Sequence, residues 1–250
     1  MTGSRAVPPA QVDRPALRHR LDDGLVAMGR GIDAALDAAG RDRLIAFLAL
    51  LQRWNGVYNL TAVRDPVEMV PRHLLDSLAI LPWVTRGPVL DAGTGAGLPG
   101  IPLAIACPAL QFTLLDGNGK KTRFVRQAVL ELGLDNVEVV HSRLEAYRPA
   151  LKFATITARA VASLSDLYQG CAHLAAADAR LLAMKGRLPE QEIEALTQAA
   201  LPSVSATGES LRTSSVVPAA TSCTVHALCV PQLDGERNLI DIPFHASAHG

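Results

Sequence analysis

Hydrophobic residues recur along the chain with two different periods, and the change of period divides the sequence into two parts. Between residues 17 and 54, apolar positions lie three to four residues apart, which is typical of amphipathic helices. From Val89 onward, short apolar runs alternate with longer segments of helical spacing. This alternation predicts a mostly parallel, doubly wound α/β sheet. We therefore expect an N-terminal helical appendage followed by a Rossmann-like domain.

The predicted elements of the second part alternate regularly. Strands are expected at Val89–Ala92, Gln111–Asp116, Val137–His141, Phe153–Thr157 and Arg180–Met184. Helices are expected at Pro99–Ala106, Gly119–Gly133, Ser163–Ala176 and Pro189–Ala200. The chain then becomes rich in Ser, Thr and Val, and strand candidates lie at Ser203–Ala206 and Thr224–Val230. These two suit an antiparallel hairpin that closes the sheet at its edge.

The first part predicts one helix over residues 17–36, with Gly40 as its stop, and a second over residues 44–54. Asp65-Pro66 is typical of a helix start, and Pro71 is expected to interrupt that helix. Four segments result: a disordered extension over 1–20, a helical region over 21–85, the Rossmann-like domain over 86–235 and a tail over 236–250.

The loop after the first predicted strand carries the clearest chemical signal. It reads Asp91-x-Gly93-x-Gly95-x-Gly97-Leu98 and runs directly into a helix. Glycine is used where the backbone takes a positive φ or approaches a ligand closely. The N–H groups at a helix N-terminus favour electron-rich ligand atoms. We interpret this strand, loop and helix start as a cradle for a nucleotide-like cofactor.

The sequence of this loop matches the binding patterns of two different cofactors. Gly95-x-Gly97-x-x-Gly100 matches the dinucleotide pattern, and Asp116 ends the next strand about 20 residues later. The pattern that begins at Asp91 matches methyltransferases that use S-adenosylmethionine (SAM). Asp91 favours SAM, because an acid would repel a pyrophosphate, whereas SAM carries a sulfonium and an ammonium and no phosphate.

Several further candidates follow the predicted strands. Asp116 is placed to bind the two ribose hydroxyls of an adenosine. Leu144 and Glu145 follow the third strand, where the adenine is expected, although Glu145 could equally be a helix-start acid. Arg159 follows the fourth strand, whose end faces the transferred group, so a cation there could hold an RNA phosphate or the guanine. Lys185 ends the fifth strand on the same rim.

Composition limits the partners. The formal net charge is +0, so an RNA contact would have to come from a local patch such as Lys120, Lys121, Arg123 and Arg126. The simpler interpretation of that run is the solvated face of a helix, which could double as an RNA-backbone contact. The 4 cysteines form no C-x-x-C motif, so we predict no metal site and expect buried thiols in a reducing compartment. No signal peptide and no membrane span are predicted, so we expect a cytoplasmic protein.

Missing motifs narrow the methyl acceptor. Carbon methylation of cytosine needs a thiolate in a Pro-Cys context, whereas the order here is Cys107-Pro108. Amine methylation usually shows Asn/Asp-Pro-Pro-aromatic after the fourth strand, and residues 157–160 read Thr-Ala-Arg-Ala. A ring nitrogen with a free lone pair needs neither nucleophile nor base, only alignment with the methyl group. These observations fit guanine N7 as the acceptor.

Separate blocks of this sequence resemble one family in their order and spacing. They are Arg53-Trp54-Asn55, Asn59-Leu60-Thr61-Ala62-Val63-Arg64-Asp65-Pro66, Arg72-His73-x-x-Asp76-Ser77-Leu78, Asp91-x-Gly93-Thr94-Gly95-x-Gly97-Leu98-Pro99-Gly100-Ile101-Pro102-Leu103, Leu114-Leu115-Asp116, Gly119-Lys120-Lys121, Ser142-Arg143-x-Glu145 and Arg159-Ala160-x-Ala162-Ser163-Leu164. Together they cover about Leu51 to Gly186. The chain thus resembles the RsmG (GidB) guanine-N7 methyltransferases of bacterial 16S ribosomal RNA.

The resemblance implies a class I SAM-dependent methyltransferase fold and methylation of guanine N7 in the 530 loop of 16S rRNA. It implies a cofactor held around Gly93, Leu98, Leu144, Glu145 and Arg159. The expected partner is 16S rRNA or the small ribosomal subunit, and we expect a monomer that does not bind membranes. Candidate RNA contacts are Arg72, His73, Lys120, Lys121, Arg123 and Lys185.

Two alternatives stay open. An NAD-dependent oxidoreductase would be expected to carry a proton donor such as Tyr-x-x-x-Lys, but none of the 3 tyrosines has a lysine four residues on. A non-catalytic ribosome-assembly factor would keep the fold and only bind RNA, although the intact glycine loop and Asp116 argue against it. The N-terminal extension and the part from Ser203 to Gly250 depart from the family pattern and leave accessory RNA contacts open.

Overall fold

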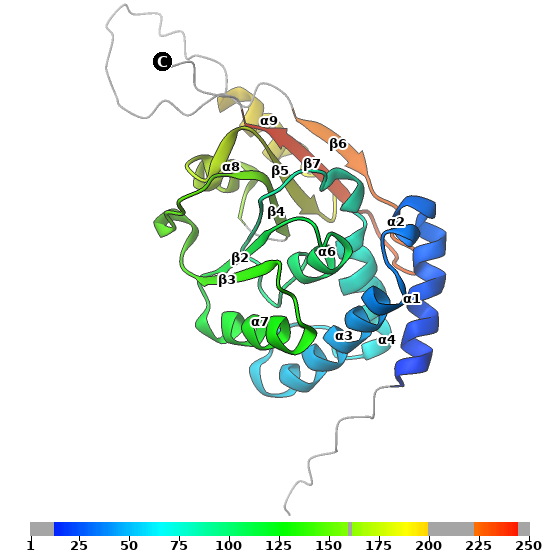
Figure 1. Cartoon of the computed structure of the whole chain (residues 1–250). Coiled ribbons are helices and arrows are strands. Elements are labelled where there is room, and N and C mark those ends of the chain that lie inside the picture. Colours follow the sequence, from blue (N-terminus) through cyan, green and yellow to red (C-terminus); the bar gives the residue numbers. More distant parts are fainter. Residues whose placement is uncertain (1–12, 160–161, 200–222, 245–250) are drawn as a thin grey trace, which may run out of the picture.

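The computed structural model describes residues 13–159, 162–199 and 223–244, and a seven-stranded sheet runs through it (Figure 1). The strand order is β3-β2-β1-β4-β5-β7-β6, and only the pairings that involve β7 are antiparallel. The strands are β1 (Val89–Ala92), β2 (Phe112–Asp116), β3 (Val137–His141), β4 (Phe153–Arg159), β5 (Ala175–Lys185), β6 (Thr224–Ala227) and β7 (Asn238–Pro243). The predicted mostly parallel sheet with an antiparallel closing strand is confirmed.

Helices cover both faces of the sheet because successive strand residues point to opposite sides. Val89 packs into a core with α6 (Gly100–Ala106), α7 (Gly119–Leu132) and the N-terminal helices. Leu90, its neighbour, packs into a second core with α8 (Leu164–Ala172) and α9 (Glu190–Ala199). The predicted helix over Ser163–Ala176 is too long at its C-terminal end, because α8 ends at Ala172 and β5 begins at Ala175.

The N-terminal helices are α1 (Arg14–Met28), α2 (Arg30–Ala34) and α3 (Ala38–Tyr58). Gly29, with φ 100°, ends α1 and splits the single helix expected over 17–36. Gly40 is no stop: its N–H is capped by Asp37 in the first turn of α3. Residues 14–20 are helical, which corrects the expected disorder there, and residues 1–12 lie outside the described part. The helices are integral to the core, because Phe47 packs against Phe124 of α7.

A continuous helical segment over residues 66–78 lies between α3 and the sheet. It consists of α4 (Pro66–Met69), a π-helical turn η1 (Val70–Leu75) and α5 (Asp76–Leu78), and a 3₁₀ turn η2 (Leu81–Trp83) follows. Asp65 caps α4 as predicted, but Pro71 does not end the helix. The chain passes Pro71 with a wider π turn instead. Such turns recur at functional sites, and this one carries Arg72 and His73.

The C-terminal part corrects the expected tail over 236–250. Asn238–Pro243 forms β7, which lies between β5 and β6 and has Leu239, Ile240 and Ile242 fully buried. Thr224–Ala227 does belong to an antiparallel pair, but its partner is β7; the other strand candidate, Ser203–Ala206, lies outside the described residues. The register pairs Asn238 with Lys185, so the start of β7 meets the end of β5 at one rim.

No helix among the described residues is long and apolar enough to cross a membrane.

Candidate functional site

Asp91 holds the glycine loop from inside the protein. Its carboxylate is fully buried; Oδ2 accepts the N–H of Gly100 at 2.9 Å, and Oδ1 accepts the hydroxyl of Thr157 at 3.0 Å. Burial raises the pKa of Asp91, and the hydrogen bonds and the charge of Arg159 oppose this rise. The direct cofactor contact expected of Asp91 is therefore not available in this structure. Asp91 positions the loop and the start of α6.

The glycine loop borders a cavity of about 390 Å³ at the carboxyl ends of β1, β2 and β4. Its lining combines loop backbone, apolar side chains and a few polar groups: Leu60, Thr61, His73, Gly93, Thr94, Gly95, Ala96, Leu98, Asp116, Lys121 and Arg159. Gly93 and Gly95 have φ of 70° and 59°, so the left-handed backbone there favours glycine. This lining brings together Gly93, Gly95, Leu98, Asp116 and Arg159 from the predicted cofactor set.

Asp116 ends β2 at this cavity. Its Oδ2 accepts the N–H of Gly95 at 2.8 Å, and its Oδ1 accepts the N–H of Asn118 at 2.7 Å. These bonds orient a partly exposed carboxylate at the cavity wall, where its free lone pairs can accept hydroxyl donors. Apolar Leu60 and Leu98 line the same space. A carboxylate, an apolar surface and a glycine backbone without side chains fit the ribose, the base and the amino-acid part of SAM.

Besides Asp91, three predicted cofactor residues lie outside this cavity. Gly97 faces Ile101, whose Cγ1 would lie 3.0 Å from a Cβ at that position, so this glycine permits close packing of α6. Leu144 and Glu145 belong to the 3₁₀ turn η3 (Leu144–Ala146) after β3. Leu144 packs into the second core, and Glu145 is exposed. A role for these residues stays a prediction.

A second cavity, of about 420 Å³, adjoins the first. His73 and Arg159 line both cavities. The remaining lining comes from the loop before α4, the helical segment, the end of β5 and the connection from β6 into β7: Val63, Arg72, Asp76, Met184, Lys185, Gly186, Leu228, Arg237 and Asn238. The structure therefore places two adjoining spaces at the carboxyl rim, with Arg159 and His73 between them.

Asp76 holds two arginines at this second cavity. Its Oδ2 lies 3.2 Å from Nη1 of Arg159, and its Oδ1 accepts Nε–H of Arg237 at 3.0 Å. Asp76 is only 6% exposed, so these contacts are shielded from solvent. The sequence analysis missed Arg237, because it lies 161 residues from Asp76 and fell in the expected tail. The sequence did contain a signal for this residue, because Arg237 and Asn238 directly precede the apolar residues of a strand, as site residues at the rim of a sheet often do.

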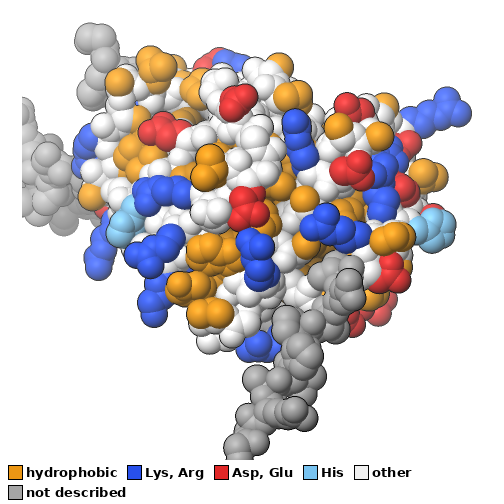
Figure 2. Space-filling view, turned by 60° about the horizontal axis from the view of Figure 1, so that its bottom comes forward, with side chains coloured by type: hydrophobic (Ala, Val, Ile, Leu, Met, Phe, Trp, Pro, Cys, Tyr) orange, Lys and Arg blue, Asp and Glu red, His pale blue; other side chains and the backbone are white. Residues whose placement is uncertain are grey.

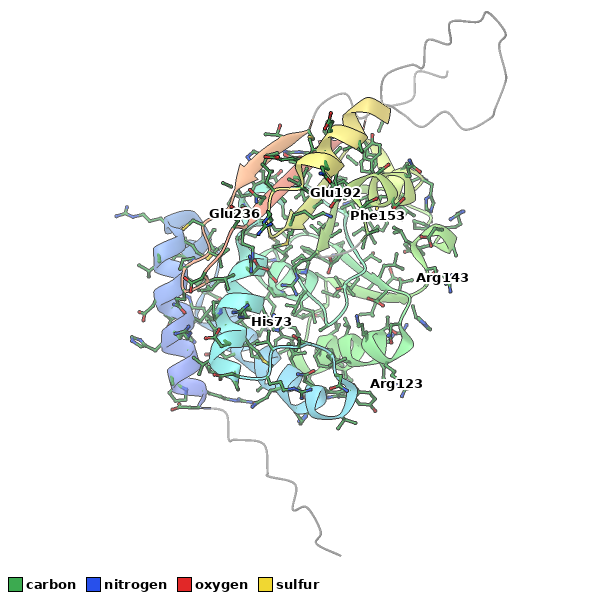
Figure 3. The ribbon with its side chains drawn as sticks, turned by 180° about the vertical axis from the view of Figure 1, so that it is seen from behind. His73, Arg123, Arg143, Phe153, Glu192 and Glu236 are labelled. Atoms are coloured by element: carbon green, nitrogen blue, oxygen red, sulfur yellow. The ribbon has the colours of Figure 1, made fainter. Side chains whose placement is uncertain are left out.

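His73 separates the two cavities as a neutral group. Its side chain comes from η1 (Figure 3), is 5% exposed and has Nε2 3.0 Å from Oγ1 of Thr61. Burial, together with the nearby charge of Arg159, lowers the pKa of His73 to about 4. His73 is therefore uncharged near neutral pH, and it adds no positive charge to the lining of the two cavities.

The pKa of His73 predicts acid sensitivity. The ordinary pKa is 6.5 and the folded one about 4, so the unfolded chain binds the proton more tightly between these values. The free energy of unfolding should therefore fall as the pH drops from 7 to 5, by about 2 kcal/mol from this group. Urea unfolding at both pH values measures this change. His73→Gln should remove about that much of the difference, whereas His19→Gln, at an exposed histidine, should leave it intact; an unchanged pH dependence in His73→Gln would contradict the assignment.

The predicted RNA contacts do not share one surface. Arg72 and Lys185 line the second cavity, where Lys185 Nζ lies 2.9 Å from Glu192 Oε2. Lys121 lines the first cavity, whereas Lys120 and Arg123 line a separate groove along α7. Figure 3 shows His73 in the interior and Arg123 at the lower edge of the molecule. No group of three or more metal-ligating side chains occurs among the described residues.

The strand order, the glycine loop after β1 and the carboxylate at the end of β2 define a class I SAM-dependent methyltransferase. The comparison with known families makes this specific. The family model for GidB, rRNA small subunit methyltransferase G, matches residues 41–214, and the chain belongs to this family.

Named relatives agree with this assignment. The "Ribosomal RNA small subunit methyltransferase G" of Marinobacter nauticus is 51% identical over 221 residues, which are 88% of this chain and 92% of that protein. The protein of the same name from Stenotrophomonas maltophilia K279a is 50% identical over 222 residues, 89% of this chain and 92% of its own length. The family resemblance found in the sequence is confirmed, and it leaves no support for the oxidoreductase alternative.

Proposed function

We propose that this chain transfers a methyl group directly, in line, from SAM to N7 of a guanine in the 530 loop of bacterial 16S rRNA, with S-adenosylhomocysteine as the leaving group. The observation that carries the proposal is the pair of adjoining cavities with Arg159 and His73 between them. One cavity suits the cofactor, and the other, open to the rim, suits a base presented by the RNA. The small ribosomal subunit or its rRNA is then the substrate.

The cofactor site assigns roles to this chain's residues. Asp116 accepts the ribose hydroxyls, Leu60 and Leu98 contact apolar parts, and the backbone of Gly93 and Gly95 permits close approach. Bound SAM supplies an electrophilic methyl group on a sulfonium. Asp91 keeps the loop in place from behind. Cofactor roles for Gly97, Leu144 and Glu145 would be indirect, because their side chains or backbone do not line this cavity.

The lining of the two cavities supports a ring nitrogen as the acceptor. Asp116 and Asp76 are the carboxylates among the described residues that line them, and Asp76 is neutralised by Arg159 and Arg237. Removal of a proton from an amine or carbon would need a free base. N7 of guanine carries an in-plane lone pair and loses no proton. Transfer to N7 therefore does not require Asp116, or the neutral imidazole of His73, to act as a base.

The arginines would position the base rather than contact N7. Guanine O6 and N7 are both acceptors that arginine recognises, but N7 must stay free to react. Arg159 and Arg237 are thus aimed at O6 or at a phosphate. Methylation leaves the base cationic, and the neutral imidazole of His73 adds no positive charge beside it.

The decisive experiment is transfer of labelled methyl from SAM to small-subunit rRNA that lacks the modification, followed by nucleoside analysis and mapping. We expect the label in N7-methylguanosine within the 530 loop. Label in another nucleoside would refute the acceptor. RNA binding without SAM binding would instead support a non-catalytic assembly factor.

A further inference from the structure

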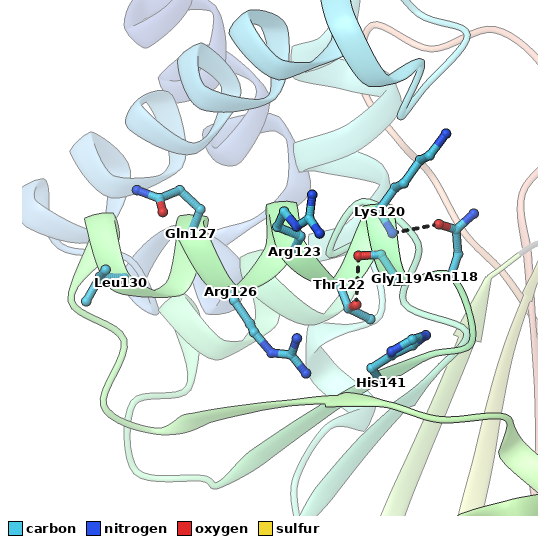
Figure 4. Close-up of a pocket in the computed structure, with 9 residues that line it drawn as sticks. All are labelled: Asn118, Gly119, Lys120, Thr122, Arg123, Arg126, Gln127, Leu130 and His141. Carbon is cyan, nitrogen blue, oxygen red and sulfur yellow. Dashed lines mark hydrogen bonds between the residues drawn. The ribbon is translucent and has the colours of Figure 1, made fainter.

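A basic groove lies along α7 at the free edge of the sheet (Figure 4). It has a volume of about 730 Å³ and runs between α7 and the end of β3. We call it the α7 groove and define it by Lys120, Arg123, Arg126, Gln127, Leu130 and His141. Figure 2 shows lysine and arginine side chains gathered at the left of the molecule, the side on which α7 lies in Figure 1.

The cations of the α7 groove are not neutralised by the protein. No acidic side chain lines it within the described part of the chain. Lys120, Arg123 and Arg126 form no ion pair with any described residue, although Arg53 and Glu131 pair nearby, at 3.0 Å. Arg126 Nη2 donates only to the carbonyl of Val139, at 3.3 Å. Since the chain has a net charge of +0, this is a local excess of positive charge.

The α7 groove begins beside the cofactor cavity. Asn118 Oδ1 accepts the N–H groups of both Lys120 and Lys121, at 2.9 and 3.3 Å, and its own N–H donates to Asp116. Lys121 turns to the cofactor cavity, whereas Lys120 turns to the groove. Lys120, Arg123 and Arg126 are spaced three residues apart, so they form one row about 9 Å long.

We propose that the α7 groove binds the sugar–phosphate backbone of the RNA substrate, outside the nucleotide that is methylated. The inference rests on the proposed function. A row of unpaired cations binds phosphates regardless of sequence and releases their counterions. Leu130, 76% exposed at the far end, offers an apolar surface that an unstacked base can cover and a free phosphate cannot use. The groove thus supplies affinity, while the two cavities select the base.

The test is the charge reversal R123E/R126E, at two exposed side chains. The matched control is R30E/R43E, which makes the same charge change at exposed arginines of α2 and α3. The dissociation constant for in vitro transcribed, unmodified 16S rRNA is measured at several KCl concentrations. We expect R123E/R126E to weaken binding about 10-fold or more and to reduce the salt slope by about two, one per lost phosphate contact. The control should change binding less than about threefold.

SAM affinity and circular dichroism check that the variants fold. Unchanged RNA affinity and salt slope in R123E/R126E would overturn the inference, as would a wild type that does not bind the RNA. An equal loss in the control would also overturn it, since the whole-protein charge would then be the cause. The assay needs no turnover, so it separates the two proposals: RNA binding through the groove without methyl transfer would refute the proposed function alone.

Discussion

Arg159→Ala should lower kcat/KM for 16S rRNA about 100-fold, which corresponds to about 2.8 kcal/mol of transition-state stabilisation. Arg159 lines both cavities, and its guanidinium is held by Asp76 at 3.2 Å. Its removal takes away charge-assisted hydrogen bonds to the acceptor, each worth about 1.5–3 kcal/mol. It also leaves buried Asp76 with Arg237 as its remaining ion-pair partner among the described residues. Steady-state methyl transfer with varied RNA measures the effect.

Arg86→Ala provides the matched control for Arg159. Arg86 also forms an ion pair, with Asp178, but both side chains are more than half exposed, at 53% and 67%. Such surface pairs contribute about 0–1 kcal/mol, so activity should stay within about twofold. Arg159→Lys keeps the positive charge but loses the planar guanidinium with its fixed set of N–H donors. Its activity should therefore stay below that of the wild type if the arrangement of these donors positions the base. Full activity of Arg159→Ala would remove Arg159 from the site and refute its positioning role.

Gly100→Ala should reduce the free energy of unfolding by about 3 kcal/mol, through overpacking and a lost cap at the start of α6. A Cβ at Gly100 would overlap Cδ2 of buried Leu114 and would lie 2.7 Å from Oδ2 of Asp91, the atom that accepts the Gly100 N–H. Because Asp91 is fully buried, neither group can move into solvent. Urea unfolding gives the stability, and SAM affinity should fall with it as the glycine loop shifts.

Gly56→Ala is the control for this substitution. Gly56 lies inside α3, and a Cβ there would meet nothing within 4 Å. Alanine should therefore stabilise the protein by about 0.5–1 kcal/mol, since glycine is the poorer helix former. Equal effects of the two substitutions would mean that the Asp91 contact does not limit residue 100.

Where local signals act alone, the structure follows the sequence closely. Both β1 and β3 match their predicted bounds, and α7 begins at the predicted residue with Asn118 as its cap. The predictions fail where tertiary packing, and not the local sequence, decides which secondary structure a segment adopts. The helix continues past Pro71 through a π turn, and β7 forms by pairing with β5, a strand far from it in the sequence.

The candidate site shows the same division. Asp116, Gly93, Gly95 and Leu98 could be placed because each follows directly from a strand–loop–helix pattern. Asp91 fits the same pattern, yet its carboxylate turns inward to Gly100 and Thr157. A motif determines which residue stands at a strand end, but not whether its side chain faces the ligand or the core.

By itself, the sequence determined the order of strands and helices from β1 to α9, the glycine cradle and the family, because period, spacing and turn chemistry are local properties. The tertiary structure decided what depends on chain segments far apart. It brought Arg237 beside Asp76 across 161 residues, directed Lys120 and Lys121 to different surfaces, and buried His73 until its pKa fell to about 4. The physical reason is that contacts, burial and electrostatic shifts arise only when the core packs.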